Sequence, residues 1–213
     1  MDKNFEKNEK NNVEIAGTVV AEPEYSHEVC GEKFYVCKIE TERTSGFKDV
    51  IPLTISDRLF RVGERLTGYR FRAVGQFRSY NLHAEDGNHL VLSVFVRDIE
   101  QLDDDNTDMM HKNEIYLDGY ICKDPIYRKT PQGREIADVL LAVNRSYGKS
   151  DFIPCIYWGR NARFASSLEV GSRVKICGRI QSREYQKCIS DTETETRVAY
   201  EVSVSKIELA EEE

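Results

Sequence analysis

The 213-residue sequence contains an internal repeat, which limits the chain to folds built from two similar units. The segments Gly17–Tyr25 and Gly119–Tyr127 lie 102 positions apart, and each places a Pro two residues before its final Tyr. Further matches follow in the same order: Asp49–Leu53 with Asp151–Cys155, 62–63 with 170–171, 74–79 with 177–182, and 94–100 with 202–208. We therefore interpret the chain as a tandem duplication, with about 90–100 residues per copy, the size of a small domain.

Polar segments predict where the two copies begin and end. Residues 1–11 are polar and predict a disordered tail, and residues 210–213 predict an acidic end. Residues 103–111 contain an acidic run without apolar periodicity, which is typical of a linker. The copies are therefore expected at residues 12–102 and 112–209.

Within each copy the hydrophobic pattern predicts mostly strands. Residues 136–143, 171–180 and 198–207 alternate or are rich in β-branched side chains, as strands are. Arg160–Leu168 has no β-branched residue and spaces Phe164 and Leu168 four apart, so it predicts one short helix. Five strands with a helix between the third and fourth are the pattern of an OB-fold, a barrel that binds oligonucleotides or oligosaccharides. The predicted fold is all-β: two tandem OB-folds, five-stranded Greek-key barrels with one short helix each.

Charge and hydropathy limit the possible functions. The chain has no stretch of about 20 apolar residues and no apolar signal segment at its N-terminus, so we expect a cytoplasmic protein without a membrane partner. Thirty Lys and Arg stand against 37 Asp and Glu, a net charge of −7. A protein that held duplex nucleic acid by overall charge would be basic. Any nucleic-acid site must therefore be local and must use more than charge.

The motifs of metal sites and of common catalytic sites are missing from the sequence. The six Cys form no C-x-x-C pair and the four His have no H-x-x-x-H spacing, so no metal and no cofactor are predicted. The repeat aligns four Cys with apolar residues of the other copy, which predicts free thiols in the core: Cys37, Cys122, Cys155 and Cys177. There is no phosphate-binding Gly-rich loop, nucleophile elbow or H-E-x-x-H motif, so the chain is not expected to be an enzyme.

The second copy, over residues 113–209, resembles the bacterial single-stranded-DNA-binding protein family and its primosomal relatives. The matching pieces, in order, are Gly119 with Asp124-Pro125, Arg128, 131–133, 141–145, 152–162, 170–171 and 178–185. No single piece is specific, but the ordered set is. The first copy resembles the family mainly through the second.

The resemblance implies which residues would bind a single strand. Its base-stacking positions correspond to Tyr147, Phe152, Trp158 and Tyr185, all still aromatic. Its basic contacts correspond to Arg128, Arg160 and Arg183, while Pro154 and Gln181 replace two further basic residues. At corresponding positions the first copy has Ser45, Val50, Ser56 and a segment beginning at Tyr80, with Phe47 close by.

Physical reasoning also favours the second copy as the binder. Stacking of one base on an aromatic ring contributes about 1–3 kcal/mol with any sequence, so a protein that relies on rings needs less positive charge. Residues 112–210 hold 16 Lys and Arg against 13 Asp and Glu, whereas residues 11–102 hold 11 against 14.

Each of these residues also has a purely structural interpretation. Tyr157 and Trp158 are adjacent, so on a strand one ring faces the core, and we expect Trp158 to face out together with Phe152. Phe152 is also compatible with packing on a neighbouring subunit, Tyr185 with capping the barrel, and Tyr147 with an ordinary loop. The three arginines are compatible with plain solvent exposure.

The leading hypothesis is sequence-tolerant binding of single-stranded DNA in replication, recombination or repair. The resemblance implies assemblies of four OB domains, hence a homodimer of this chain, and contacts with replication or repair proteins. The alternative is a protein–protein adaptor, primosome-like or an accessory of a mobile element, with weak or no DNA binding. It is favoured by an end, 211–213, without the apolar tip that the family uses to recruit partners. RNA binding is a smaller alternative, because stacking does not distinguish ribose from deoxyribose.

Overall fold

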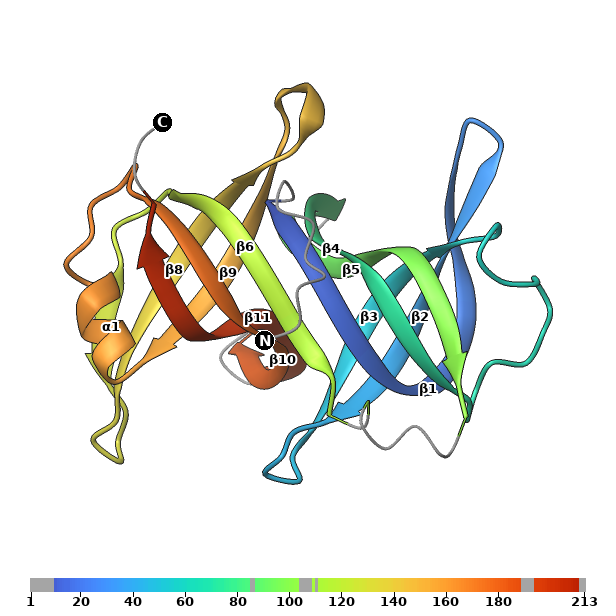
Figure 1. The fold of residues 1–213 in the computed structure, drawn as a ribbon, viewed down its shortest axis with the longest axis horizontal. Coiled ribbons are helices and arrows are strands. Elements are labelled where there is room, and N and C mark those ends of the chain that lie inside the picture. The colour runs from blue at the N-terminus through green and yellow to red at the C-terminus, as the bar shows by residue number, and fades with distance from the viewer. Residues whose placement is uncertain (1–9, 85–86, 104–108, 110, 189–193, 211–213) are drawn as a thin grey trace.

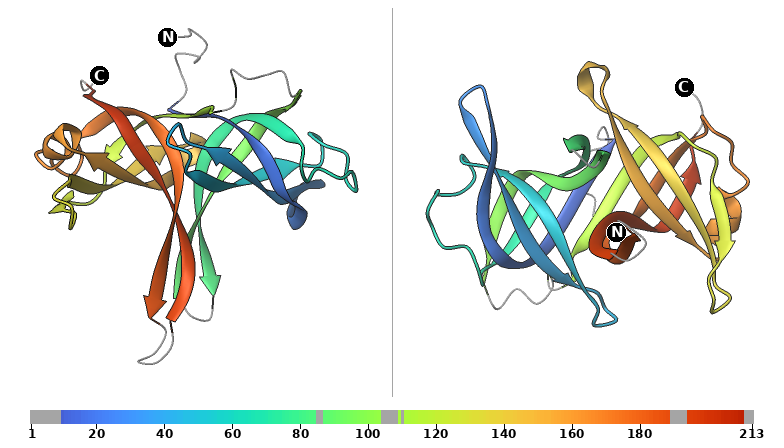
Figure 2. Two further views of the ribbon diagram at one scale, coloured as in Figure 1. Left: turned by 90° about the horizontal axis from the view of Figure 1, so that it is seen from below. Right: turned by 180° about the vertical axis from the view of Figure 1, so that it is seen from behind.

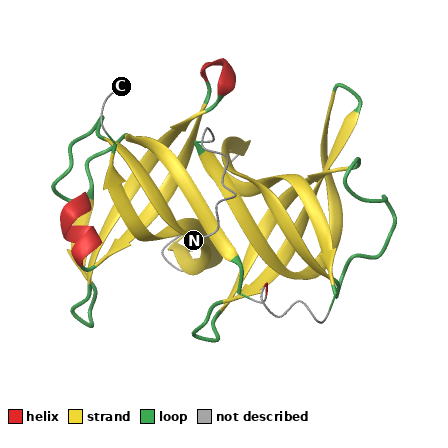
Figure 3. Cartoon of the chain, in the orientation of Figure 1, coloured by secondary structure: helices red, strands yellow, loops and turns green. Residues whose placement is uncertain are grey.

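The computed structural model describes residues 10–84, 87–103, 109, 111–188 and 194–210, with the side chains of 83–89 excepted. Two β-barrels lie side by side (Figure 1), and strands dominate both (Figure 3). Most of the expected tail, linker and acidic end lies outside the described residues. No helix in the described part of the chain has the length and apolar character needed to cross a bilayer.

The first barrel contains five strands, which close in the order β1–β2–β3–β5–β4–β1. They are β1 (Asn11–Val29), β2 (Glu32–Glu42), β3 (Lys48–Ser56), β4 (Arg70–Ala84) and β5 (Gly87–Leu102). All pairs are antiparallel except β3 with β5, where Leu53 lies opposite Val94. This parallel contact closes the barrel and completes the OB-fold topology.

The second barrel repeats this topology. Its elements are β6 (Asn113–Ile121), β7 (Ile126–Lys129), β8 (Glu135–Asn144), β9 (Ser150–Trp158), α1 (Arg160–Ala165), β10 (Arg173–Cys188) and β11 (Thr194–Leu209), with a 3-10 turn at Ser146–Gly148. The parallel pair is β9 with β11, where Cys155 lies opposite Val202. Strands β6 and β7 together correspond to β1, which shows register shifts around Ala21–Glu24. The predicted all-β tandem OB-fold is confirmed.

The expectation of a helix in each barrel is wrong for the first barrel. Helix α1 lies between β9 and β10 and buries Ala162 and Ala165. The corresponding residues 57–69 of the first barrel contain turns and no helix. Because the repeat aligns 62–63 with 170–171, residues 57–61 of the first barrel correspond to residues 159–169 of the second, and this shorter segment leaves no room for the helix.

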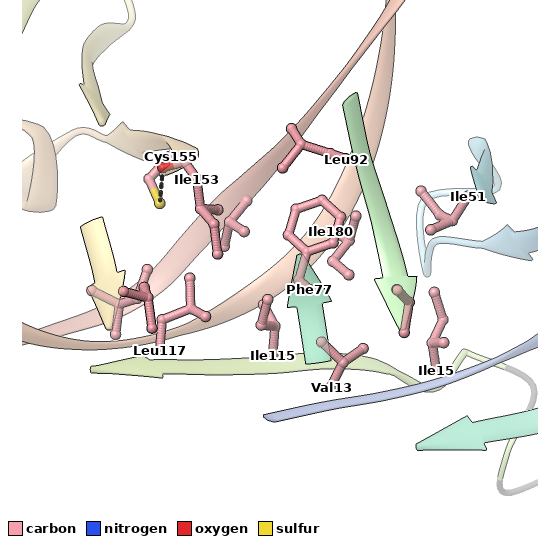
Figure 4. Close-up of a cluster of buried hydrophobic side chains, with 14 of the residues drawn as sticks. Val13, Ile15, Ile51, Phe77, Leu92, Ile115, Leu117, Ile153, Cys155 and Ile180 are labelled. Carbon is pink, nitrogen blue, oxygen red and sulfur yellow. Dashed lines mark hydrogen bonds between the residues drawn. The ribbon is translucent and has the colours of Figure 1, made fainter. Parts of the chain in front are cut away.

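The core follows the alternation of each strand. Large apolar side chains from both barrels, such as Phe77, Ile15 and Leu117, are fully buried, as Figure 4 shows for part of this cluster. Cys37 and Cys155 are buried as expected, and Cys122 is partly buried. Cys177 is exposed, contrary to expectation, because it alternates with the buried Ile176 on β10.

One continuous sheet joins the barrels. Strands β1 and β6 pair antiparallel, with Asn11 opposite Leu117 and Ile15 opposite Asn113, so that all eleven strands form a single sheet. The two long hairpins β4–β5 and β10–β11 extend from the same side of the molecule (Figure 2).

Two matching polar clamps also cross the seam between the barrels. Asp49 of β3 accepts a hydrogen bond of 2.8 Å from the backbone N–H of Ser182 in the second barrel. Asp151 of β9 accepts one of 2.6 Å from the N–H of Ser79 in the first. Both aspartates are almost fully buried, so these bonds fix how the barrels sit on each other.

Candidate nucleic-acid interface

Trp158 is held in place at the end of β9. Its neighbour Tyr157 is fully buried, whereas Trp158 is 37% exposed, so the two rings face opposite sides of the strand. The indole Nε1–H donates a 3.2 Å hydrogen bond to Oγ of Ser203 on β11. This bond sets the ring orientation, and the outer part of the ring remains open to solvent.

The Trp158 ring lines a groove of about 910 Å³ that runs between the two barrels, which we call the seam groove. The second barrel supplies Arg134, Trp158, Arg179, 181–184, Val198, Tyr200 and 203–205. The first barrel supplies Lys38, Arg43, Phe47, Lys48 and Val50. The groove is therefore a property of both copies together.

The seam groove is strongly basic in a protein of net charge −7. Its lining contains six cationic side chains and one carboxylate, that of Glu184: the cations are Lys38, Arg43, Lys48, Arg134, Arg179 and Arg183. Carboxylates beside the groove pair with some of these, Glu40 with Lys48 at 2.7 Å and Glu201 with Arg183 at 3.8 Å. The Lys48–Glu40 pair is exposed and therefore weak, so a phosphate can replace it. Glu201 is buried, as is Asp49, which pairs with Arg43 at 2.6 Å, and these two carboxylates stay in place.

A second groove, of about 920 Å³, also lies between the barrels, with the roles of the two copies exchanged. We call it the counter-groove. In the seam groove the β2–β3 loop of the first barrel faces β10. In the counter-groove the β8–β9 loop of the second barrel faces Gln76 and Arg78 of β4. Lys10, Arg145 and Lys149 also line it. The tandem duplication thus produces two similar basic grooves.

Tyr147 belongs to the counter-groove. Its side chain is completely exposed and its backbone has a φ of 63°, in the left-handed region that non-glycine residues rarely adopt. A fully exposed ring on a strained backbone gains nothing from packing, which is the observation that marks it as a candidate contact residue.

The structure does not bring the expected site residues into one channel. Trp158 and Arg183 line the seam groove and Tyr147 the counter-groove. Phe152 and Tyr185 are 42% and 39% exposed but are absent from the lining of either groove.

The other two arginines lie outside both grooves. Arg128 on β7 pairs with Asp138 at 2.7 Å, and this hydrogen bond is the main cause that raises its pKa. Arg160 is exposed at the start of α1. Both can contact only a strand that continues past the seam groove.

Sequence reasoning missed the first-barrel wall and Arg179. Arg179 aligns with Gln76 of the first copy, so the repeat itself marked it as a basic residue gained in the second copy. Gln181, where the resemblance implies a lost cation, is buried and donates to Glu201 at 2.7 Å. The position of the first-barrel residues depends on how the copies pack, which no pattern within one copy reveals.

Comparisons with known proteins point to the same half of the chain. Residues 112–210 match the family model described as the single-strand binding protein family. Single-stranded DNA-binding protein 2 of Listeria innocua is 40% identical over 81 residues, which cover 35% of this chain and 51% of that protein. Single-stranded DNA-binding protein A of Bacillus subtilis is also 40% identical over 81 residues, which cover 35% of this chain and 47% of that protein. The chain thus spans about half the length of the curated relatives it matches.

A solved structure is similar over nearly the whole chain. The wild-type single-stranded DNA binding protein from Thermus aquaticus superposes with a TM-score of 0.77 at 19% identity, covering 95% of this chain and 94% of that one. At this identity the likeness shows the fold of both barrels. The family match is what confirms the resemblance that the sequence indicates: the second barrel, over residues 112–210, is similar to the single-strand binding protein family.

Proposed function

We propose that the chain binds single-stranded DNA without sequence preference, with Trp158 as the central stacking ring. The observation that carries this proposal is the seam groove, which places an oriented, partly exposed indole among six cationic side chains. Unpaired bases offer flat faces to such a ring, while the phosphates between them offer negative charge to the cations. The names of the curated relatives support single-stranded DNA as the ligand.

The mechanism we propose separates two kinds of contact. Trp158 stacks one base, while Arg183 and the other groove cations bind phosphates and release counterions, which makes affinity depend on salt. Phe152 and Tyr185 provide further exposed rings on β9 and β10 for a strand that continues beyond the groove. Arg128 and Arg160 extend the basic contacts in the same way.

The wider role that we propose is protection of exposed strands in replication, recombination or repair, in the cytoplasm of a bacterium and close to its nucleoid. The bacterial sources of the curated relatives support this setting. We also propose a homodimer with four OB barrels, together with contacts to replication or repair proteins.

Fluorescence anisotropy of a labelled oligo-dT tests the proposed function. We expect saturable binding that weakens as salt is raised, with much weaker binding to a duplex of the same length. No binding to oligo-dT at low salt would contradict the proposal and favour the protein–protein adaptor. Competition by oligo-U equal to that by oligo-dT would extend the ligand to RNA.

A further inference from the structure

The first barrel forms one wall of the seam groove, although its own face lacks most of the expected rings. The positions that correspond to Tyr147, Phe152 and Trp158 are Ser45, Val50 and Ser56. Yet Lys38, Phe47 and Lys48 of this barrel line the groove that contains Trp158. The first barrel, which lacks most stacking rings of its own, therefore faces the groove that contains Trp158 of the second barrel.

Phe47 in this wall is exposed and held rigidly. Its side chain is 56% exposed, and the guanidinium of Arg43 lies 4.4 Å from the ring centroid on one face. Two hydrogen bonds of 2.6 Å anchor that guanidinium on the buried Asp49. The loop itself is closed by a 2.8 Å bond from the Arg43 N–H to the Phe47 carbonyl. Because Arg43 covers one face of the ring, the other face is the one available to a base.

Arg179 lies between the two walls with an unsatisfied donor. Its Nε is buried and has no hydrogen-bond partner among the residues that the structure describes. Burial is the main cause that lowers its pKa, and the nearby positive charge of Arg43 adds to this effect. The carboxylate of Asp49 counters part of this effect, but within the described part of the chain the Nε–H of Arg179 stays unpaired, and an anion in the groove would accept it.

We infer that the first barrel is part of the strand-binding site: Phe47 stacks a base, and Lys48 and Arg179 bind phosphates, of the strand that stacks on Trp158. This inference rests on the proposed function and adds to it that a bound strand crosses from one barrel to the other. Lys48 Nζ bonds Glu40, which is partly exposed, so a phosphate can displace that contact.

The test compares two double variants of the full chain by anisotropy with labelled oligo-dT. Phe47→Ala with Lys48→Ala removes a ring and a cation from the groove wall. Tyr69→Ala with Arg61→Ala removes the same kinds of side chain from the loop at residues 57–69, where both are exposed and line neither groove. Urea unfolding of both variants checks that the fold is retained.

The groove variant is expected to bind at least about fivefold more weakly than wild type, because one stacked base is lost. Its plot of log affinity against log salt should be shallower by about 0.7, the value for one phosphate contact on a single strand. The loop variant should match wild type in both measurements. A groove variant that binds like the loop variant, while wild type binds oligo-dT, would overturn the inference and leave the proposed function intact. Absence of binding by wild type would instead remove the proposed function.

If the groove variant fails to fold, the single variant Lys48→Gln, which removes only the charge, tests whether Lys48 contacts a phosphate. An unchanged salt dependence in a folded Lys48→Gln protein would count against the inference. A reduced one would support it.

Discussion

Binding of a strand by this protein depends on which way individual aromatic side chains point, and Trp158 points outward at the end of β9. Its outward orientation follows from strand alternation beside the buried Tyr157, and the sequence predicts it. The same alternation predicts an exposed Phe152, but exposure alone does not place a ring in the groove. The resemblance predicts Tyr147 as a stacking residue like Trp158, but Tyr147 lies in the counter-groove, because its loop extends toward the other barrel.

We predict that Trp158→Ala weakens binding to oligo-dT by about 1–3 kcal/mol, since it removes one stacking ring. The free energy of unfolding should change far less than for a buried ring, because the indole is partly exposed and makes a single hydrogen bond. Anisotropy titration and urea unfolding measure the two quantities.

Phe164→Ala is the matched control, since Phe164 is 41% exposed on α1 of the same barrel and lies outside both grooves. Equal affinities for the Trp158 and Phe164 variants would exclude Trp158 from the site.

At the scale of elements, period and β-branching predict strands well because each strand of a small barrel has one buried face. The helix expected in the first barrel is absent because the first copy is shorter at this point: residues 57–61 precede the matched pair 62–63, whereas residues 159–169, which include α1, precede 170–171. Nor did the sequence predict the clamps, although Asp49 and Asp151 are a matched pair in the repeat.

We expect Asp151→Asn to lower the free energy of unfolding by about 1–3 kcal/mol, because it weakens a buried acceptor. Asp151 accepts hydrogen bonds from Arg145 and from the Ser79 N–H across the seam. Asp49→Asn should lower the free energy of unfolding by a similar amount, because Asp49 forms the equivalent clamp with Ser182. Urea unfolding gives the values.

Asp138→Asn serves as the control for these variants, since the exposed pair of Asp138 with Arg128 is expected to contribute less than about 1 kcal/mol. If Asp151→Asn lowers the free energy of unfolding no more than Asp138→Asn does, the clamp does not stabilise the seam.

For the whole molecule, the duplication predicts two barrels but not their relative position. Pairing of β1 with β6 and the two clamps create the seam, and the seam creates both basic grooves. These features depend on contacts between residues far apart in the chain, which no local pattern contains. The chain has a net charge of −7, so it can bind nucleic acid only through a locally basic site. The two grooves at the seam are such sites.

We predict that the protein is a homodimer in solution, with twice the mass of the 213-residue chain by light scattering. The basis is the family resemblance, which implies assemblies of four OB domains, and this chain supplies two of them. A mass that equals one chain at all concentrations would contradict this prediction without affecting strand binding by the seam groove.

Whether a single strand stacks in the seam groove can be measured through the intrinsic fluorescence of Trp158. It is the only tryptophan of the chain, so the signal reports on this groove alone. Titration with oligo-dT is expected to quench the emission in proportion to binding, and added salt should restore it. Emission that stays unchanged while anisotropy shows the oligonucleotide bound would rule out stacking on Trp158, because the strand would then lie elsewhere on the protein.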